Sequence, residues 1–330
     1  MVSRTTRTER EVTASRSDAT TRATTATVGV LAYRGAQVAA VLGLVDLLEA
    51  ASRMHSERGG RRGLAVEPLR GSSLTSPERP YAALVLPPSL GAEPLGRASP
   101  RLRSWLVGRH REGTVLCSVC VGAFLLADAG LLDGRPVTTH WAHAAELKRR
   151  HPRLEVAADR LLVDDGDIVT AGGVMAWIDL GLHLISRLLG PTTMLATARM
   201  FLVDPGGRDQ RYYALFSPEH THGDADVLRV QRWLRRTLSQ PVSVDDMAAK
   251  ARLGRRTFQR RFLRATGLNA GAYLQHLRVA AARELLERGD KTLEEVAWAV
   301  GYTDPGGFRR VFGRLMGLSP ADYRRRFHAG

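Results

Sequence analysis

The feature that most constrains this 330-residue chain is a pattern of about fifty residues that occurs twice toward its carboxyl end. The first copy opens with residues 243–251 (SVDDMAAKA), and the second opens 49 positions later with residues 292–300 (TLEEVAWAV). Each begins with a hydroxyl residue and then places apolar residues at i, i+3, i+4 and i+7, which predicts a short helix with one buried face. Asp246 and Glu295 follow the hydroxyl by three residues, where a carboxylate can reach back to the capping N–H.

Each copy continues with a glycine-containing turn and a second helix. Gly254 and Gly301 lie in the two turns. Paired phenylalanines at i, i+4 spacing then mark the buried faces, namely Phe258 with Phe262 and Phe308 with Phe312. The opposite faces carry basic and amide side chains, which are Arg255, Arg256, Gln259, Arg260, Arg309 and Arg310.

These exposed faces have the chemistry of a DNA reader. Arg can bind guanine O6 and N7 through two hydrogen bonds, and Gln can bind adenine N6 and N7 in the same way. A helical bundle with a solvated basic face is the simpler alternative. Caps, turns, core spacing and charge agree in both copies, however, and this agreement favours two helix-turn-helix units.

Residues 241–327 resemble the AraC-type DNA-binding domain, whose motifs match VDDMAAKARLGRRTFQRRF, RVAAARELLE and LEEVAWAVGYTDPGGFRRVFGRLMGLSPADYRRRF. The resemblance implies two recognition helices that enter successive major grooves about 34 Å apart. The chain departs from this pattern at Gly306 and Gly307, which offer no side chains to bases. We therefore expect the second unit to contact mostly phosphates, and we expect residues 324–326 (three arginines) to meet phosphates or solvent.

The charge distribution agrees with a polyanionic partner. The formal net charge is +15, and residues 223–330 hold 21 Lys and Arg against 11 Asp and Glu, whereas residues 1–222 hold 27 against 22. Most of the excess therefore lies where DNA is expected to bind. The chain shows no secretory signal or membrane span, and its two cysteines do not form a disulfide framework, so we predict a cytoplasmic protein.

The preceding part of the chain alternates apolar strands with helices. Strands are predicted at 27–33, 64–69, 82–86, 114–119, 161–164 and 168–170, and helices at 38–51, 101–111, 122–129, 141–150 and 174–189. This alternation predicts an α/β domain with a doubly wound, mainly parallel sheet. We expect a disordered tail over 1–25, the α/β domain over 26–202, a connector over 203–223 and the all-α DNA-binding domain over 224–330.

A candidate site lies where the strand at 114–119 runs directly into a helix. Cys120 occupies this tight turn, a position that lowers a thiol pKa, and His140 follows twenty residues later. The alternative is a small buried cysteine with an ordinary capping histidine. A zinc set of Cys117, Cys120, His140 and His143, or a redox cysteine pair, is disfavoured because the two cysteine side chains would diverge; no cofactor or metal is expected.

Residues 120–141 and 170–184 resemble the PfpI-like, class I glutamine amidotransferase-like domain. Together with the carboxyl-terminal domain, the chain resembles the GlxA-type AraC regulators, which implies a sensor and dimerisation module. Three departures disfavour catalysis: Ala40 replaces an acidic residue near the thiol, Pro88-Ser89 replaces a glycine pair that helps form an oxyanion site, and Val121 replaces a histidine. Asp46 or Glu49 remains an alternative acidic partner.

We therefore expect a DNA-binding transcriptional regulator controlled by a small polar or anionic effector. Its site would be formed by Cys120, Val121, Gly122, His140, Ala171, Gly172 and Gly173, at the carboxyl edge of the sheet. The expected partners are double-stranded promoter DNA, the unknown effector and a second copy of the chain, with RNA polymerase left open. The alternatives are a DNA-tethered cysteine amidase or peptidase, and a regulator whose first domain only dimerises.

Overall fold

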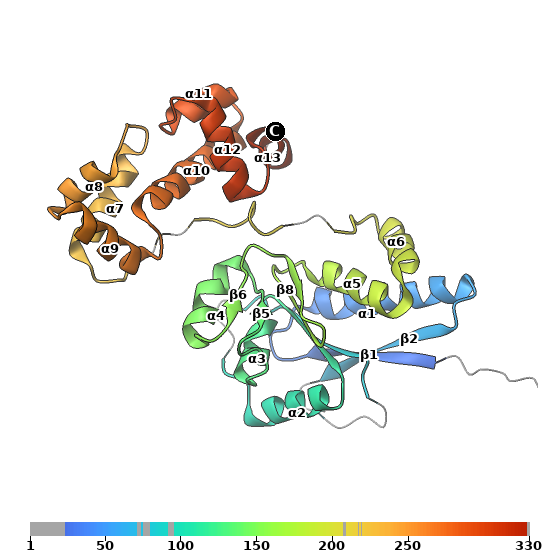
Figure 1. The fold of residues 1–330 in the computed structure, drawn as a ribbon. Coiled ribbons are helices and arrows are strands. Elements are labelled where there is room, and N and C mark those ends of the chain that lie inside the picture. The colour runs from blue at the N-terminus through green and yellow to red at the C-terminus, as the bar shows by residue number, and fades with distance from the viewer. Residues whose placement is uncertain are drawn as a thin grey trace, which may run out of the picture.

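The computed structural model describes residues 24–70, 74, 80–91, 96–206, 209–216, 218 and 220–328. An α/β part and a helical part are joined by an extended connector (Figure 1). The predicted tail lies outside the described residues up to residue 23, and the first strand begins at Thr24, before the expected boundary. One apolar core fills the α/β part and two fill the helical part, one for each predicted helix-turn-helix unit.

The α/β part is built on a six-stranded sheet with strand order β2-β1-β3-β4-β8-β7. All neighbouring strands pair in parallel except β7, which is antiparallel to β8. The central strands β3, β4 and β8 are mostly apolar and almost fully buried, as strands covered on both faces should be. The strands are β1 (Thr24–Ala32), β2 (Arg62–Arg70), β3 (Ala83–Leu86), β4 (Val115–Val119), β7 (Leu162–Asp164) and β8 (Ile168–Ala171).

Helices cover both faces of this sheet, which confirms the predicted doubly wound architecture (Figure 1). One layer contains α1 (Val38–Glu57), α5 (Trp177–Leu189) and α6 (Pro191–Met200). The other contains α2 (Pro100–Arg111), α3 (Gly122–Asp128) and α4 (Ala144–Arg150). The predicted helix at 141–150 is divided into a 3-10 turn, η1 (Trp141–His143), followed by α4. A short parallel pair, β5 (Pro136–Val137) and β6 (Glu155–Val156), was not predicted, because two-residue strands carry no periodic signal.

The helical part contains seven helices among its described residues. Capping boxes begin α8 and α11 at Ser243 and Thr292, as predicted: each hydroxyl accepts from the N3 backbone N–H, and the N3 carboxylate accepts from the cap N–H. The helices are α7 (Ala225–Thr237), α8 (Val244–Ala251), α9 (Arg255–Thr266), α10 (Ala270–Arg288), α11 (Leu293–Ala299), α12 (Pro305–Met316) and α13 (Pro320–Phe327).

The turns of the two units are made differently. In the second unit Gly301 takes a positive φ of 88°, as a turn glycine often does. In the first unit Arg252 takes the left-handed conformation, with φ 57°, while Gly254 has φ −64° and is the N-cap of α9. Glycine is thus present in both turns but supplies the left-handed residue only in the second. No helix among the described residues is long and apolar enough to cross a bilayer.

Candidate DNA interface and sensor site

The first recognition helix, α9, is fixed by two buried rings. Phe258 and Phe262 are both 0% exposed and pack in the core of the first unit. Burying each phenyl ring contributes roughly 1.5–3 kcal/mol, so the rotation of α9 about its axis is strongly specified. The same rotation leaves four predicted DNA-contacting side chains exposed, which are Arg255, Arg256, Gln259 and Arg260.

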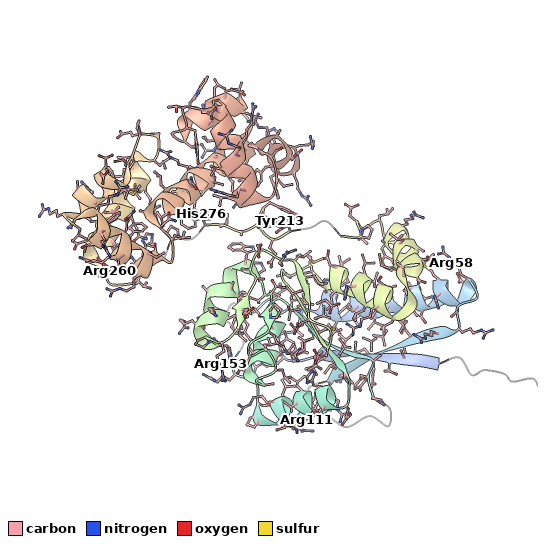
Figure 2. The ribbon with its side chains drawn as sticks, viewed as in Figure 1. Arg58, Arg111, Arg153, Tyr213, Arg260 and His276 are labelled. Carbon is pink, nitrogen blue, oxygen red and sulfur yellow. The ribbon has the colours of Figure 1, made fainter. Side chains whose placement is uncertain are left out.

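Three of these four side chains have no partner within the described chain. Arg255 forms an ion pair with Asp245 at 2.9 Å. Arg256, Gln259 and Arg260 make no hydrogen bond or ion pair with any other described residue. Arg260 lies at the outer side of the helical part (Figure 2). The donors of these three groups are therefore available to base edges without the loss of an existing contact.

The second recognition helix, α12, presents its arginines differently. Arg309 is paired with Glu294 at 2.6 Å, and Arg310 lies 3.4 Å from Asp304. Asp304 caps α12 by accepting from the N–H groups of Gly306 and Gly307, and these two hydrogen bonds, together with Arg310, lower the pKa of its carboxyl group. The backbone of the glycines therefore belongs to the helix cap, and Arg309 and Arg310 each have an acidic partner in the free chain.

The arginine cluster of α13 also contacts the connector. Arg326 does not simply face solvent, because its guanidinium stacks 4.8 Å from the ring centre of Tyr212 in the connector. Arg325 is paired with Asp322. Arg326 is nevertheless exposed, so its contact with the connector comes in addition to the expected contact with phosphates or solvent, which stays a prediction.

The predicted elbow in the α/β part is present. Cys120 follows β4 with a positive φ of 56°, which costs on the order of 1–3 kcal/mol for a residue with a side chain. Its N–H donates to Ala171 O at 2.7 Å, which extends the β4 and β8 pairing by one hydrogen bond. A Cβ at Gly122 would lie 2.5 Å from the carbonyl oxygen of Leu86, so the first residue of α3 must be glycine. The elbow is thus locked from both neighbouring strands.

The predicted low pKa of Cys120 is wrong. Burial raises the pKa of this thiol to about 11, although hydrogen bonds from the N–H groups of Val121 and His140 oppose the shift. The residue is only 1% exposed. Desolvation of a thiolate therefore outweighs the elbow geometry, and the N–H of Val121 is directed at the sulfur rather than left open for an anion.

His140 approaches Cys120 with its backbone and not with its ring. Its imidazole Nδ1 accepts from the N–H of Ala142 at 3.1 Å and caps the 3-10 turn. Burial, followed by the proximity of His143, lowers the pKa of His140, so the ring is neutral at pH 7. Thr139 donates its hydroxyl to Cys120 O at 2.7 Å. The capping alternative for His140 is therefore confirmed.

Among the described residues, no acidic side chain contributes to the pKa of the Cys120 thiol. Ala40 is fully buried in α1, whereas Asp46 and Glu49 are exposed side chains of the same helix. Neither of these carboxylates contributes to the pKa shift of Cys120. Pro88 lies beside the start of α1, where its carbonyl accepts from Gln37 N at 2.7 Å. Neither Asp46 nor Glu49 therefore takes the place of the acidic residue that Ala40 replaces.

The remaining predicted site residues border a side chain that sequence reasoning missed. Ala171 ends β8 and is buried, and Gly173 follows with a φ of 80°. Between them, a Cβ on Gly172 would lie 1.9 Å from Nε2 of Gln210, a connector residue that is 2% exposed. Its burial had no sequence signal, because glutamine in a polar connector is normally solvated. Within the described chain, no three His, Cys, Asp or Glu residues are grouped as metal ligands would be.

Comparison with known proteins identifies both parts. Residues 24–187 match the DJ-1/PfpI family, and residues 247–326 match a helix-turn-helix domain. The regulator CdhR of Pseudomonas aeruginosa is 29% identical over 71% of this chain and 70% of its own length. The regulator GlxA of Rhizobium meliloti is 31% identical over 66% of this chain and 67% of its own. GbdR of Pseudomonas aeruginosa is 27% identical over 67% of this chain, and the match spans 60% of its length. All three are named as HTH-type transcriptional regulators.

Proposed function

Because this chain belongs to the GlxA-like regulators of the AraC family, with a DJ-1/PfpI domain before a helix-turn-helix domain, we propose a division of work between its parts. The helical domain binds double-stranded DNA. In the proposal, α9 supplies most of the base reading and α12 supplies mostly phosphate contacts. The α/β domain senses a small effector without chemical turnover.

The observation that carries the DNA proposal is the contrast between the two recognition helices. On α9, Arg256, Gln259 and Arg260 are exposed and unpaired within the described chain. On α12, Arg309 and Arg310 each begin from a carboxylate partner. Exposed ion pairs contribute only about 0–1 kcal/mol, so DNA can displace the carboxylates from these arginines. The free energy of each broken ion pair is then lost from the free energy of the new contact with a base.

Selection of binding sites from a random duplex library tests this division. The full chain should enrich a strong half-site whose preference is lost when Gln259 or Arg260 becomes Ala. Changing Arg309 to Ala should lower affinity on every duplex by a similar factor and reduce the salt dependence by about one phosphate contact. Loss of base preference in the Arg309 variant, with preference retained in the other two, would overturn the assignment.

The sensor proposal rests on the state of the Cys120 thiol. A pKa of about 11 leaves on the order of one thiolate in ten thousand at pH 7, and no cationic side chain among the described residues contributes to lowering this pKa. The elbow still collects Cys120, Val121, Gly122, His140, Ala171, Gly172 and Gly173 at the carboxyl ends of β4 and β8, where doubly wound folds bind ligands. Because Cys120 is buried, an effector binds there by displacing neighbouring side chains, which suits a signalling site.

A ligand screen and a turnover assay separate this proposal from the enzyme alternative. Small amides, carboxylates and quaternary amines would be tested for thermal stabilisation of the full chain and of Cys120→Ser. We expect one chemical class to stabilise the wild type and this response to change in the variant, with no amide or peptide hydrolysed by either protein. Hydrolysis by the wild type that disappears in Cys120→Ser would establish a DNA-tethered amidase or peptidase instead.

We further propose that the regulator acts in the cytoplasm as a homodimer. Val38 and Leu42 on α1 and Met175 before α5 are exposed apolar side chains, and Gln37 reaches Met175, so these residues gather at one end of the helix layer. Apolar residues grouped on a surface favour contact with a second copy. Sedimentation of the wild type and of Leu42→Glu tests the dimer: a monomeric wild type contradicts it.

A further inference from the structure

The connector is anchored inside both domains by residues two positions apart. The side chain of Gln210 is 2% exposed and is hydrogen-bonded within the α/β domain. The side chain of Tyr212 is also 2% exposed and packs in the core of the second helix-turn-helix unit. Phe216 continues the series by packing into the core of the first unit. Figure 2 places Tyr213, between these anchors, on the segment that joins the two domains. A flexible tether would leave such side chains in solvent.

The amide of Gln210 is saturated with hydrogen bonds. Its Nε2 lies 2.9 Å from Thr139 O, 2.8 Å from Arg160 O and 3.2 Å from Thr138 Oγ1, and its Oε1 accepts from Trp141 N at 3.1 Å. These partners come from the loop that contains His140 and from the segment before β7. Together with the space above Gly172, they form a slot shaped for one carboxamide.

The slot shares atoms with the surroundings of Cys120. Thr139 accepts from Gln210 through its carbonyl and donates its hydroxyl to Cys120 O at 2.7 Å. Ala171, which accepts from Cys120 N, directly precedes Gly172, whose missing side chain leaves room for the Gln210 amide. A shift of the elbow therefore moves Thr139 on one side of the slot and Ala171 on the other, and so changes the shape of the slot.

The other end of the connector is held as firmly. Arg283, 7% exposed on α10, donates to Ala214 O and, through Nε, to Tyr323 Oη at 2.9 Å. Arg326 stacks on Tyr212, and Tyr213 meets the ring of Phe327 edge-on at 5.6 Å. The connector thus contacts both α10 and α13, the helices that support α12.

We propose that Gln210 is a latch which couples the Cys120 elbow to the second helix-turn-helix unit, so that occupation of the elbow changes the freedom of that unit. The part that names an effector rests on the function proposed above. The coupling itself is a property of the chain without any ligand. When the Gln210 amide occupies its slot, Tyr212 is held in the core of the second helix-turn-helix unit. When the amide leaves the slot, this restraint on the second unit is lost.

Hydrogen exchange of the full chain, without DNA or effector, tests the coupling. Gln210→Ala removes a set of buried hydrogen bonds, each worth about a factor of five in an opening equilibrium. Exchange should rise at least about tenfold in residues 138–141 and also in α10 and α13. Gln240→Ala is the control, because that glutamine is exposed and is hydrogen-bonded to the described residues only through its backbone N–H and carbonyl. It should leave both regions unchanged.

Gly172→Ala provides a second route to the same state and covers the case in which Gln210→Ala folds poorly. Its methyl group would expel the amide from the sensor side, with no change in the connector itself. Faster exchange at 138–141 without any change in α10 and α13, in either variant, overturns the latch. Failure of every compound in the ligand screen would instead contradict effector sensing, and a coupled response in these variants would still stand.

Discussion

Replacement of Arg260 by Ala is the sharpest test of base reading by α9. The side chain is exposed and has no partner among the described residues, so its removal should leave folding stability within about 0.5 kcal/mol of the wild type. A bidentate contact to a base contributes about 1–3 kcal/mol of discrimination, which corresponds to a factor of roughly 5–150 in Kd. The loss should therefore be confined to binding.

Arg309 on α12 is the matched comparison. Its guanidinium must first leave Glu294, at 2.6 Å, and this exposed pair is worth about 0–1 kcal/mol. We expect Arg309→Ala to weaken binding several-fold less than Arg260→Ala on the preferred site. Fluorescence anisotropy on the selected duplex, and on duplexes with one altered base pair, measures both variants over a range of salt concentrations. Equal losses for Arg260→Ala on all duplexes would refute base reading by this residue.

Three further predictions concern stability and reactivity. Gly122→Ala should destabilise the chain by about 1–3 kcal/mol in urea unfolding, because its Cβ would lie 2.5 Å from a backbone carbonyl oxygen. Gly108→Ala is the control: its Cβ would meet open space in α2, so this variant should stabilise the chain by about 0.5–1 kcal/mol. Alkylation of Cys120 should accelerate continuously between pH 7 and 10, because its pKa is about 11, and a plateau near pH 8 contradicts this. Hydrogen bonding to Arg261 lowers the pKa of Asp224 in the folded chain. The ionised Asp224 should therefore stabilise the fold fully above its unfolded pKa of about 3.9, and this stabilisation should vanish as the pH falls through the lower folded pKa. Asp224→Ala should flatten the pH dependence of stability and cost about 0.5–2 kcal/mol, because the N-cap of α7 is lost.

The helical domain could be predicted closely because its determinants are local. The capping boxes at Ser243 and Thr292 and the i, i+4 phenylalanines each act within one or two turns of chain. The turn of the first unit was predicted, but its left-handed residue was not, because Arg252 takes the conformation that glycine usually supplies. No local pattern distinguishes such an arginine from a solvated one.

The elbow at Cys120 was predicted correctly, but the pKa of its thiol was not. A strand that runs into a helix at Cys120 is visible in the sequence, and the elbow is present. The pKa depends on how completely other segments cover the sulfur, and burial reverses the effect of the turn itself. The same limitation applies to His140, since spacing cannot tell whether its ring or its backbone faces the thiol.

The sequence is least informative about the connector, and there the structure adds most to the account of regulation. Two residues of extended chain span at most about 7 Å, so the anchors at Gln210 and Tyr212 cannot move independently by more than that distance. Buried interiors resist small displacements and change between discrete arrangements. Withdrawal of the Gln210 amide must therefore either pull on the second helix-turn-helix core or release Tyr212 from it. In the proposed latch, this spacing is what carries a change at the elbow to α12, and no contact between an effector and DNA is required.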